Sequence, residues 1–78
     1  MDSKQLALVY LMEECNHMAT VCTKNVHSLD KKKTNKDIEQ QLGILFSAMR
    51  EVAEEFRLNE DRVQSFAQEE YDRRATEK

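Results

Sequence analysis

Glu13, Glu14 and His17 are the residues of this 78-residue sequence whose types and spacing suggest metal chemistry. Glu13 precedes His17 by four residues and Glu14 precedes it by three, so their side chains converge if the segment is helical. Carboxylates suit Mg²⁺, whereas an imidazole biases a site toward Zn²⁺, Ni²⁺ or Mn²⁺. The three residues are therefore candidate metal ligands. The alternative is an exposed helical edge with His17 at its boundary.

The remaining reactive side chains give no sign of catalysis. The Ser, Thr and Cys residues lack a neighbouring base with an orienting partner, and the sequence has no glycine-rich phosphate loop. Cys15 and Cys22 lie seven residues apart on one predicted helix, so their Cα atoms are about 10 Å apart, which is too far for a disulfide. We expect two buried thiols that act as small hydrophobic side chains, in a reducing, cytoplasmic compartment. No catalytic residue is predicted.

A long first helix is needed to position the candidate ligands. It is predicted to begin at Ser3, a good N-cap, and to run for about 25 residues. Its apolar residues recur every three or four positions, which is typical of one buried helical face. They are Leu8, Leu11, Met12, Cys15, Met18, Ala19, Cys22, Val26 and Leu29. A turn is predicted at residues 30–33.

A second helix is predicted to open with a variant capping box at residues 34–37. Its main apolar residues alternate in steps of four and three, the heptad spacing of coiled-coil packing. This predicted interface consists of Ile38, Leu42, Leu45, Met49, Val52 and Phe56, and Phe46 and Ala53 widen it. Asn59 is the predicted N-cap of a shorter third helix, and the charged tail at residues 72–78 is expected to fray.

The composition favours a single all-α domain over residues 1–78. The chain has no proline and one glycine, so it has few means of making the tight turns of β-rich folds. Two long helices joined by a short turn form an antiparallel hairpin, followed by the short third helix. A chain this small buries only about 60% of its unfolded surface, and each long helix has an apolar face too wide for one partner. We therefore expect two hairpins to pair as a homodimeric four-helix bundle, or to assemble further as a dimer of dimers.

Charge and hydropathy argue against two classes of partner. The net charge is −3, made up of +2 over residues 1–36 and −5 over residues 37–78. Such opposite halves favour antiparallel pairing, and the basic run at residues 31–33 is too short for a nucleic-acid patch. The longest apolar run, residues 6–12, is too short to cross a bilayer. We therefore expect neither nucleic acid nor a membrane as a partner.

The order of the motifs resembles that of the MazG-like nucleoside triphosphate pyrophosphohydrolases. That family carries Glu-Glu-x-x-Glu in one helix and, after a loop, Glu-x-x-Asp within the string EELGDLLF in the next. The counterparts here are Glu-Glu-Cys-Asn-His at residues 13–17 and Gln-Gln-Leu-Gly-Ile-Leu-Phe at residues 40–46. The resemblance covers roughly residues 6–75. It implies an all-α fold in which clustered carboxylates hold Mg²⁺ for cleavage of a nucleoside triphosphate to the monophosphate and pyrophosphate.

This sequence departs from the family's acidic cluster at three positions. By position, Glu13 and Glu14 keep two acidic ligands, whereas His17, Gln41 and Ile44 replace the other three. A neutral amide is a poor Mg²⁺ ligand beside a carboxylate and isoleucine cannot ligate, so less negative charge is available to hold a divalent ion. We therefore expect a degenerate, non-catalytic member without a cofactor. It would act through self-association and bind a protein partner or a nucleotide.

Two alternatives remain open from the sequence. One is an active pyrophosphohydrolase with altered ligands that depends on Mg²⁺ or Mn²⁺. The other is an unrelated helical adaptor whose seam accepts a partner helix. The small size and the reduced motif also suit a phage or mobile-element protein.

Overall fold

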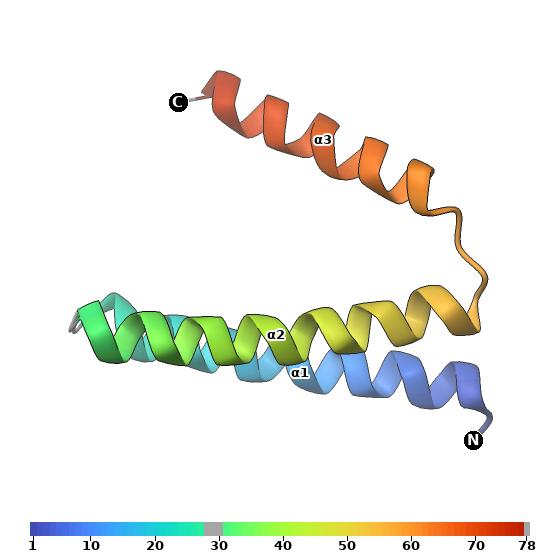
Figure 1. The fold of residues 1–78 in the computed structure, drawn as a ribbon, viewed down its shortest axis with the longest axis horizontal. Helices are drawn as coiled ribbons and strands as arrows, with labels where there is room; N and C mark the ends of the chain where they lie inside the picture. Colours follow the sequence, from blue (N-terminus) through green and yellow to red (C-terminus); the bar gives the residue numbers. More distant parts are fainter. Residues whose placement is uncertain (28–30, 78) are drawn as a thin grey trace.

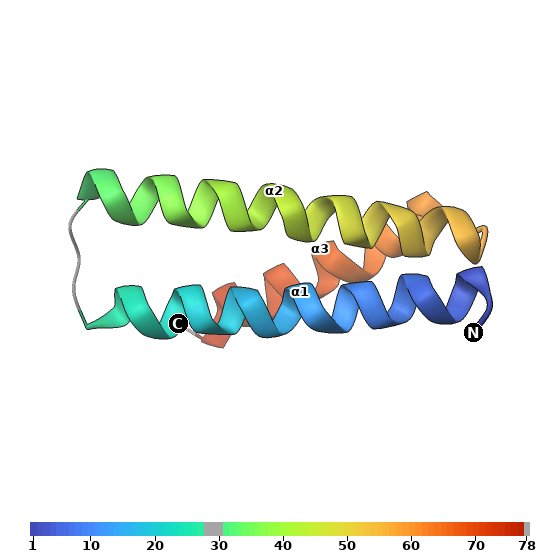
Figure 2. The ribbon, with the colours of Figure 1, turned by 90° about the horizontal axis from the view of Figure 1, so that it is seen from below.

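The computed structural model describes residues 1–27 and 31–77, which contain three helices: α1 (Ser3–Val26), α2 (Lys31–Glu55) and α3 (Glu60–Glu77). α1 and α2 lie side by side and antiparallel as a hairpin, and α3 turns back from the end of α2 (Figures 1 and 2). For the described part of the chain, the predicted all-α class and hairpin are therefore confirmed. None of the described helices is long and apolar enough to cross a membrane.

α1 is capped by Asp2, one residue before the predicted cap. Asp2 Oδ1 accepts a hydrogen bond from the backbone N–H of Gln5 (2.8 Å), and Gln5 Oε1 accepts one from the backbone N–H of Asp2 (2.9 Å). This reciprocal pair is a capping box with glutamine at its third helical position. The Ser3 hydroxyl instead donates to Glu55 Oε2 (2.9 Å) and so ties the start of α1 to the end of α2.

α2 begins earlier than the sequence analysis predicts. It starts at Lys31, so the predicted turn at residues 31–33 and the predicted capping box at Thr34 are wrong, whereas Leu29 and Asp30 lie outside the described residues. Thr34 is buried inside the helix, and its hydroxyl donates to Asn25 Oδ1 on α1 (2.9 Å). Thr34 therefore serves the contact between the helices, because Asn25 presents a buried acceptor there.

Small and hydrogen-bonding side chains form the row of α2 that contacts α1, which we call the polar seam. It consists of every seventh residue: Thr34, Gln41, Ala48 and Glu55. Ile38, Leu45 and Val52 of the predicted interface flank this row and are half-buried. Met49 and Phe56 remain 46% and 37% exposed. The contact with α1 is thus offset by one residue from the predicted row, since the closest contacts use polar and small groups instead of the largest apolar ones.

α2 ends in a Schellman motif. Arg57 adopts a left-handed conformation (φ 51°), and its N–H donates to the Glu54 carbonyl (3.3 Å). The N–H of Leu58 donates to the Ala53 carbonyl (3.0 Å). Asn59 then caps α3, as predicted, because its Oδ1 accepts a hydrogen bond from a backbone N–H of the first turn (3.0 Å). These bonds fix the direction in which α3 leaves the hairpin.

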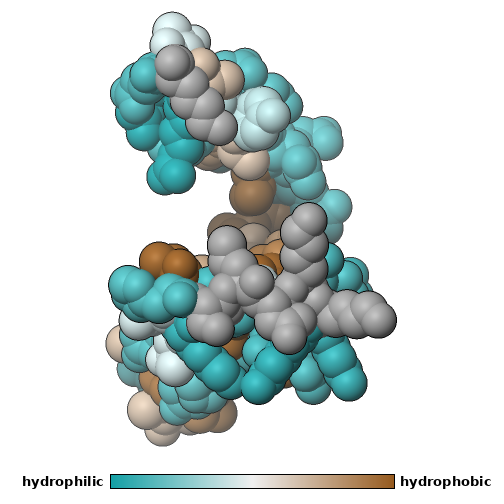
Figure 3. Space-filling model, turned by 90° about the vertical axis from the view of Figure 1, so that its left-hand side faces the viewer, coloured by the Kyte–Doolittle hydropathy of each residue, from teal (hydrophilic) through white to brown (hydrophobic). Residues whose placement is uncertain are grey.

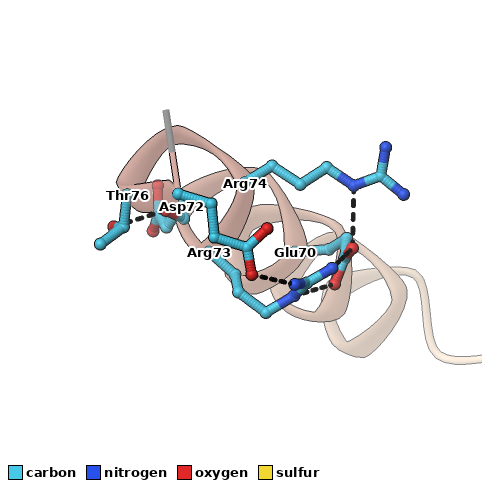
Figure 4. Close-up of polar contacts among 6 residues, drawn as sticks. Glu70, Asp72, Arg73, Arg74 and Thr76 are labelled. Atoms are coloured by element: carbon cyan, nitrogen blue, oxygen red, sulfur yellow. Dashed lines mark hydrogen bonds and ion pairs between the residues drawn. The ribbon is translucent and has the colours of Figure 1, made fainter.

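Ion pairs stabilise α3 along its own length, so the predicted fraying is wrong for residues 72–77; the last residue of the chain lies outside the described part. Arg74 Nε lies 2.9 Å from Glu70 Oε1, Arg73 Nε lies 3.1 Å from Glu70 Oε2, and Arg73 also reaches Glu77 (2.6 Å; Figure 4). Hydrogen bonds from Arg73, and then from Arg74, lower the pKa of Glu70 to about 2. Glu70 therefore stays charged and bridges two arginines.

α3 stands away from the hairpin (Figures 1 and 3), and none of its described residues is buried. Hydrophobic side chains lie on both sides of the gap. Cys15 and Cys22 are free and exposed, so the prediction of two buried thiols is wrong. It fails because α2 contacts a side of α1 one residue step away from both cysteines.

Candidate functional site

Glu14 is the predicted site residue that points into the hairpin. Its side chain is 12% exposed, and its Oε1 lies 2.9 Å from His17 Nδ1 and 3.2 Å from Gln41 Nε2. Gln41 Nε2 also lies 3.4 Å from the backbone oxygen of Glu14. Three of the five positions singled out by the family resemblance therefore meet at the contact between α1 and α2.

Both neighbours favour the charged form of the Glu14 carboxylate. The hydrogen bond from His17, followed by the bond from Gln41, lowers the pKa of Glu14 below its ordinary value, against a smaller opposing effect of burial. Both bonds end on the same oxygen, Oε1. The chemistry of this group is therefore that of one carboxylate held by an imidazole and an amide, all from this chain.

Glu13 does not join this group. It is exposed, whereas Glu14 is half-buried, because successive helical residues point about 100° apart. Within residues 1–27 and 31–77, no three or more His, Cys, Asp or Glu side chains lie close enough together to hold a metal ion. The metal-ligand role of Glu13, Glu14 and His17 therefore stays a prediction.

A depression of about 360 Å³ lies between α1 and α2 beside Gln41. Its lining residues are Thr20, Val21, Lys24, Asp37, Gln40, Gln41 and Ile44. Lys24 Nζ and Asp37 Oδ2 are 4.0 Å apart, so the charge of the lysine is offset by its neighbour. Ile44 adds an apolar side chain to this lining. The lining therefore presents amides and one charge pair whose charges offset each other. It offers a triphosphate few charge-assisted hydrogen bonds.

Sequence reasoning missed Lys24 and Asp37 at this depression, and Asn25 and Thr34 beside it. These four residues form two contacts that join α1 to α2, Lys24 with Asp37 and Thr34 with Asn25, so both contacts depend on the register of the hairpin. The signal that would have found them is the position of the turn, because residues at equal distances from the turn lie at the same level in an antiparallel pair. The predicted turn was placed too late in the chain to give that register.

A second surface, which we call the open face, runs along both helices of the hairpin. Its α1 residues are Leu8, Met12, Cys15, Ala19, Cys22 and Val26, all exposed and spaced four and three apart. Its α2 residues are Leu42, Phe46, Met49, Ala53 and Phe56, which are exposed or half-buried. On each helix the row lies one residue beyond the row that contacts the other helix. Since the helices are antiparallel, this equal offset brings both rows to the same side of the hairpin.

The start of α3 lies over the α2 half of the open face. Met49 and Ala53 of α2 line a depression of about 280 Å³ together with Leu58 and Val63. Beyond it α3 diverges, and the gap seen in Figure 3 opens between them. On α1, Leu8 and Met12 line a second, almost wholly apolar depression of about 490 Å³. The open face thus continues under α3 without being covered by it.

The comparison of this chain with protein-family models found no match, and the comparisons with curated proteins and with solved structures found none either. Two features of the molecule therefore bear on function. One is the Glu14 group with the depression beside Gln41. The other is the open face.

Proposed function

We propose that this chain is a non-catalytic, MazG-like helical protein that acts through self-association. The open face of one hairpin would pair with that of a second copy to give a four-helix bundle. The proposal rests on the open face, where α1 and α2 each carry a row of apolar side chains on the same side of the hairpin. Large side chains in these rows are exposed to water, such as Met12 (64% exposed) and Phe46 (60% exposed). A contiguous apolar patch of this kind marks an interaction surface.

The absence of catalysis is inferred from the neighbours of Glu14. A Mg²⁺-dependent phosphoryl site needs several carboxylates around the ion, because their charge offsets the repulsion of the phosphates. Glu14 instead faces an amide at 3.2 Å and an imidazole at 2.9 Å. The depression beside Gln41 would then hold a segment of a protein partner, because its lining offers little to bind the phosphates of a nucleotide.

Sedimentation equilibrium tests the self-association. We expect the wild-type protein to be a dimer, and Ala19→Glu to be a monomer at the same concentration, because it places a charge in the middle of the open face. Thr20→Glu is the matched control, since it adds the same charge to an exposed residue on another side of α1. A monomeric wild type, or equal dissociation of the two variants, would contradict the proposed interface.

A nucleotide panel tests the inferred lack of catalysis. Purified protein is incubated with nucleoside triphosphates and Mg²⁺ or Mn²⁺, and pyrophosphate release is measured. We expect no release, and no difference between the wild type and Glu14→Ala. Turnover that disappears in Glu14→Ala would instead show an active pyrophosphohydrolase with altered ligands.

A further inference from the structure

The geometry points to α3 as a clasp: the gap between α3 and its own hairpin takes the hairpin of a second copy, and α3 packs against that copy. This inference rests on the proposed self-association and adds to it a defined part of the interface. Val63, Phe66 and Ala67 form the apolar side of α3, and all three are exposed. Val63 is partly covered by the α2 side of the depression that it shares with Met49 and Ala53, whereas Phe66 remains 63% exposed.

The connection between α2 and α3 argues against closure of α3 onto its own hairpin. Only residues 56–59 separate the two helices, and hydrogen bonds tie both ends of this link. The left-handed Arg57 sets the turn, with Leu58 bonded to Ala53 and Asn59 bonded to the first turn of α3. These hydrogen bonds order both ends of the short link and so favour the open orientation of α3.

The exposed area of the chain is more than large enough for an interface with a second copy. A compact protein of 9.2 kDa is expected to expose about 4,900 Å², whereas this chain exposes 6817 Å². The excess, about 1,900 Å² per chain, is more than twice the roughly 800 Å² that each partner contributes to an interface of standard size. An interface made of the open face and the inner side of α3 is therefore large enough for a stable dimer.

Charge complementarity also favours a second copy of this chain as the occupant of the gap. α3 carries six acidic and three basic side chains, a net charge of −3. The segment at residues 24–37 of the hairpin carries five lysines and two aspartates, a net charge of +3. An acidic helix and a basic hairpin segment in every copy favour association of two copies over repulsion between them.

Ala67→Glu tests the clasp. Ala67 lies on the side of α3 that carries Val63, and it is exposed, so the change leaves the lone chain intact. Ser65→Glu is the matched control, because it adds the same charge on the opposite side of the same helix. In sedimentation equilibrium we expect Ala67→Glu to raise the dimer dissociation constant tenfold or more relative to Ser65→Glu. Equal dissociation constants would overturn the clasp.

Cross-linking of the wild type decides which hairpin α3 contacts. Equal amounts of ¹⁴N- and ¹⁵N-labelled protein are mixed, allowed to exchange, and treated with a carbodiimide that joins carboxylates to lysines without a spacer. We expect pairs between α3 carboxylates and hairpin lysines in which the two peptides carry different isotopes. Pairs of a single isotope only would show that α3 folds onto its own hairpin, and would overturn the clasp.

The two proposals fail in distinguishable ways. A monomeric wild type removes both the proposed self-association and the clasp. A wild-type dimer that dissociates in Ala19→Glu but not in Ala67→Glu leaves the open face as the interface and removes the clasp alone.

Discussion

The buried hydrogen bond between Thr34 and Asn25 leads to a sharp prediction for Thr34→Val. Valine has nearly the shape of threonine, so the change removes the hydroxyl that donates to Asn25 Oδ1 (2.9 Å) and keeps the packing. A hydrogen bond contributes about 1 kcal/mol, and a buried acceptor left without a donor costs about 1–3 kcal/mol. The added methyl returns less than about 0.8 kcal/mol. The free energy of unfolding should therefore fall by about 1–2 kcal/mol.

Urea unfolding followed by circular dichroism measures this loss at a fixed protein concentration. For a chain this small, the free energy changes by about 1 kcal/mol per molar urea, so the midpoint should fall by about 1–2 M. Thr23→Val is the matched control, because the Thr23 hydroxyl also donates (2.9 Å, to the Ala19 carbonyl) but is exposed. Its effect should stay within about 0.5 kcal/mol.

A double-mutant cycle isolates the pair. In Asn25→Leu combined with Thr34→Val, both partners are apolar and no buried acceptor is left without a donor. The combined loss should therefore be smaller than the sum of the two single losses, with a coupling of about 0.5 kcal/mol or more. Strict additivity, or a Thr34→Val midpoint equal to that of Thr23→Val, would refute the reasoning.

Three further changes have expected outcomes. Gly43→Ala should raise the free energy of unfolding by about 1 kcal/mol in a thermal melt, because nothing lies within 4 Å of an added Cβ and alanine favours a helix interior; an unchanged melt would contradict this. Glu70 has a pKa lowered from 4.5 to about 2, so its stabilisation of α3 is present above pH 4.5 and is lost as the pH falls through about 2; Glu70→Gln should lack this step in a circular dichroism titration. Gln41→Glu combined with Ile44→Asp should create Mg²⁺ or Mn²⁺ binding in calorimetry, whereas Gln40→Glu should not; no gain would count against the MazG-like resemblance.

The fold was predictable from the sequence because apolar spacing and capping residues act locally. The hairpin and the Asn59 cap follow from such signals. The start of α2 does not follow from local signals. A threonine can cap a helix at its start, and it can equally donate a hydrogen bond from a buried position inside a helix. Its role is decided by Asn25, which is distant in sequence and near in space. A local signal cannot distinguish the two.

The site was predictable in part for the same reason. The Glu14–His17 contact follows from their spacing of three residues on one helix. The approach of Gln41 to Glu14 needs the register of the two helices, which the residue spacing within each helix does not give. The exposure of Cys15 and Cys22 was missed because an apolar stripe shows which side avoids water and not which element covers it.

The polar seam has a consequence for how this protein can change over evolution. Its hydrogen bonds fix one alignment of α1 and α2, because sliding one helix by a heptad would set Glu14 opposite Thr34 or Ala48 and leave Gln41 without its acceptor. The apolar residues of the open face take no part in that alignment. Substitutions there can alter what the hairpin associates with while the hairpin itself keeps its register. In the proposed association, the alignment of the helices and the choice of partner would therefore depend on separate rows of the same two helices, and each could change without the other.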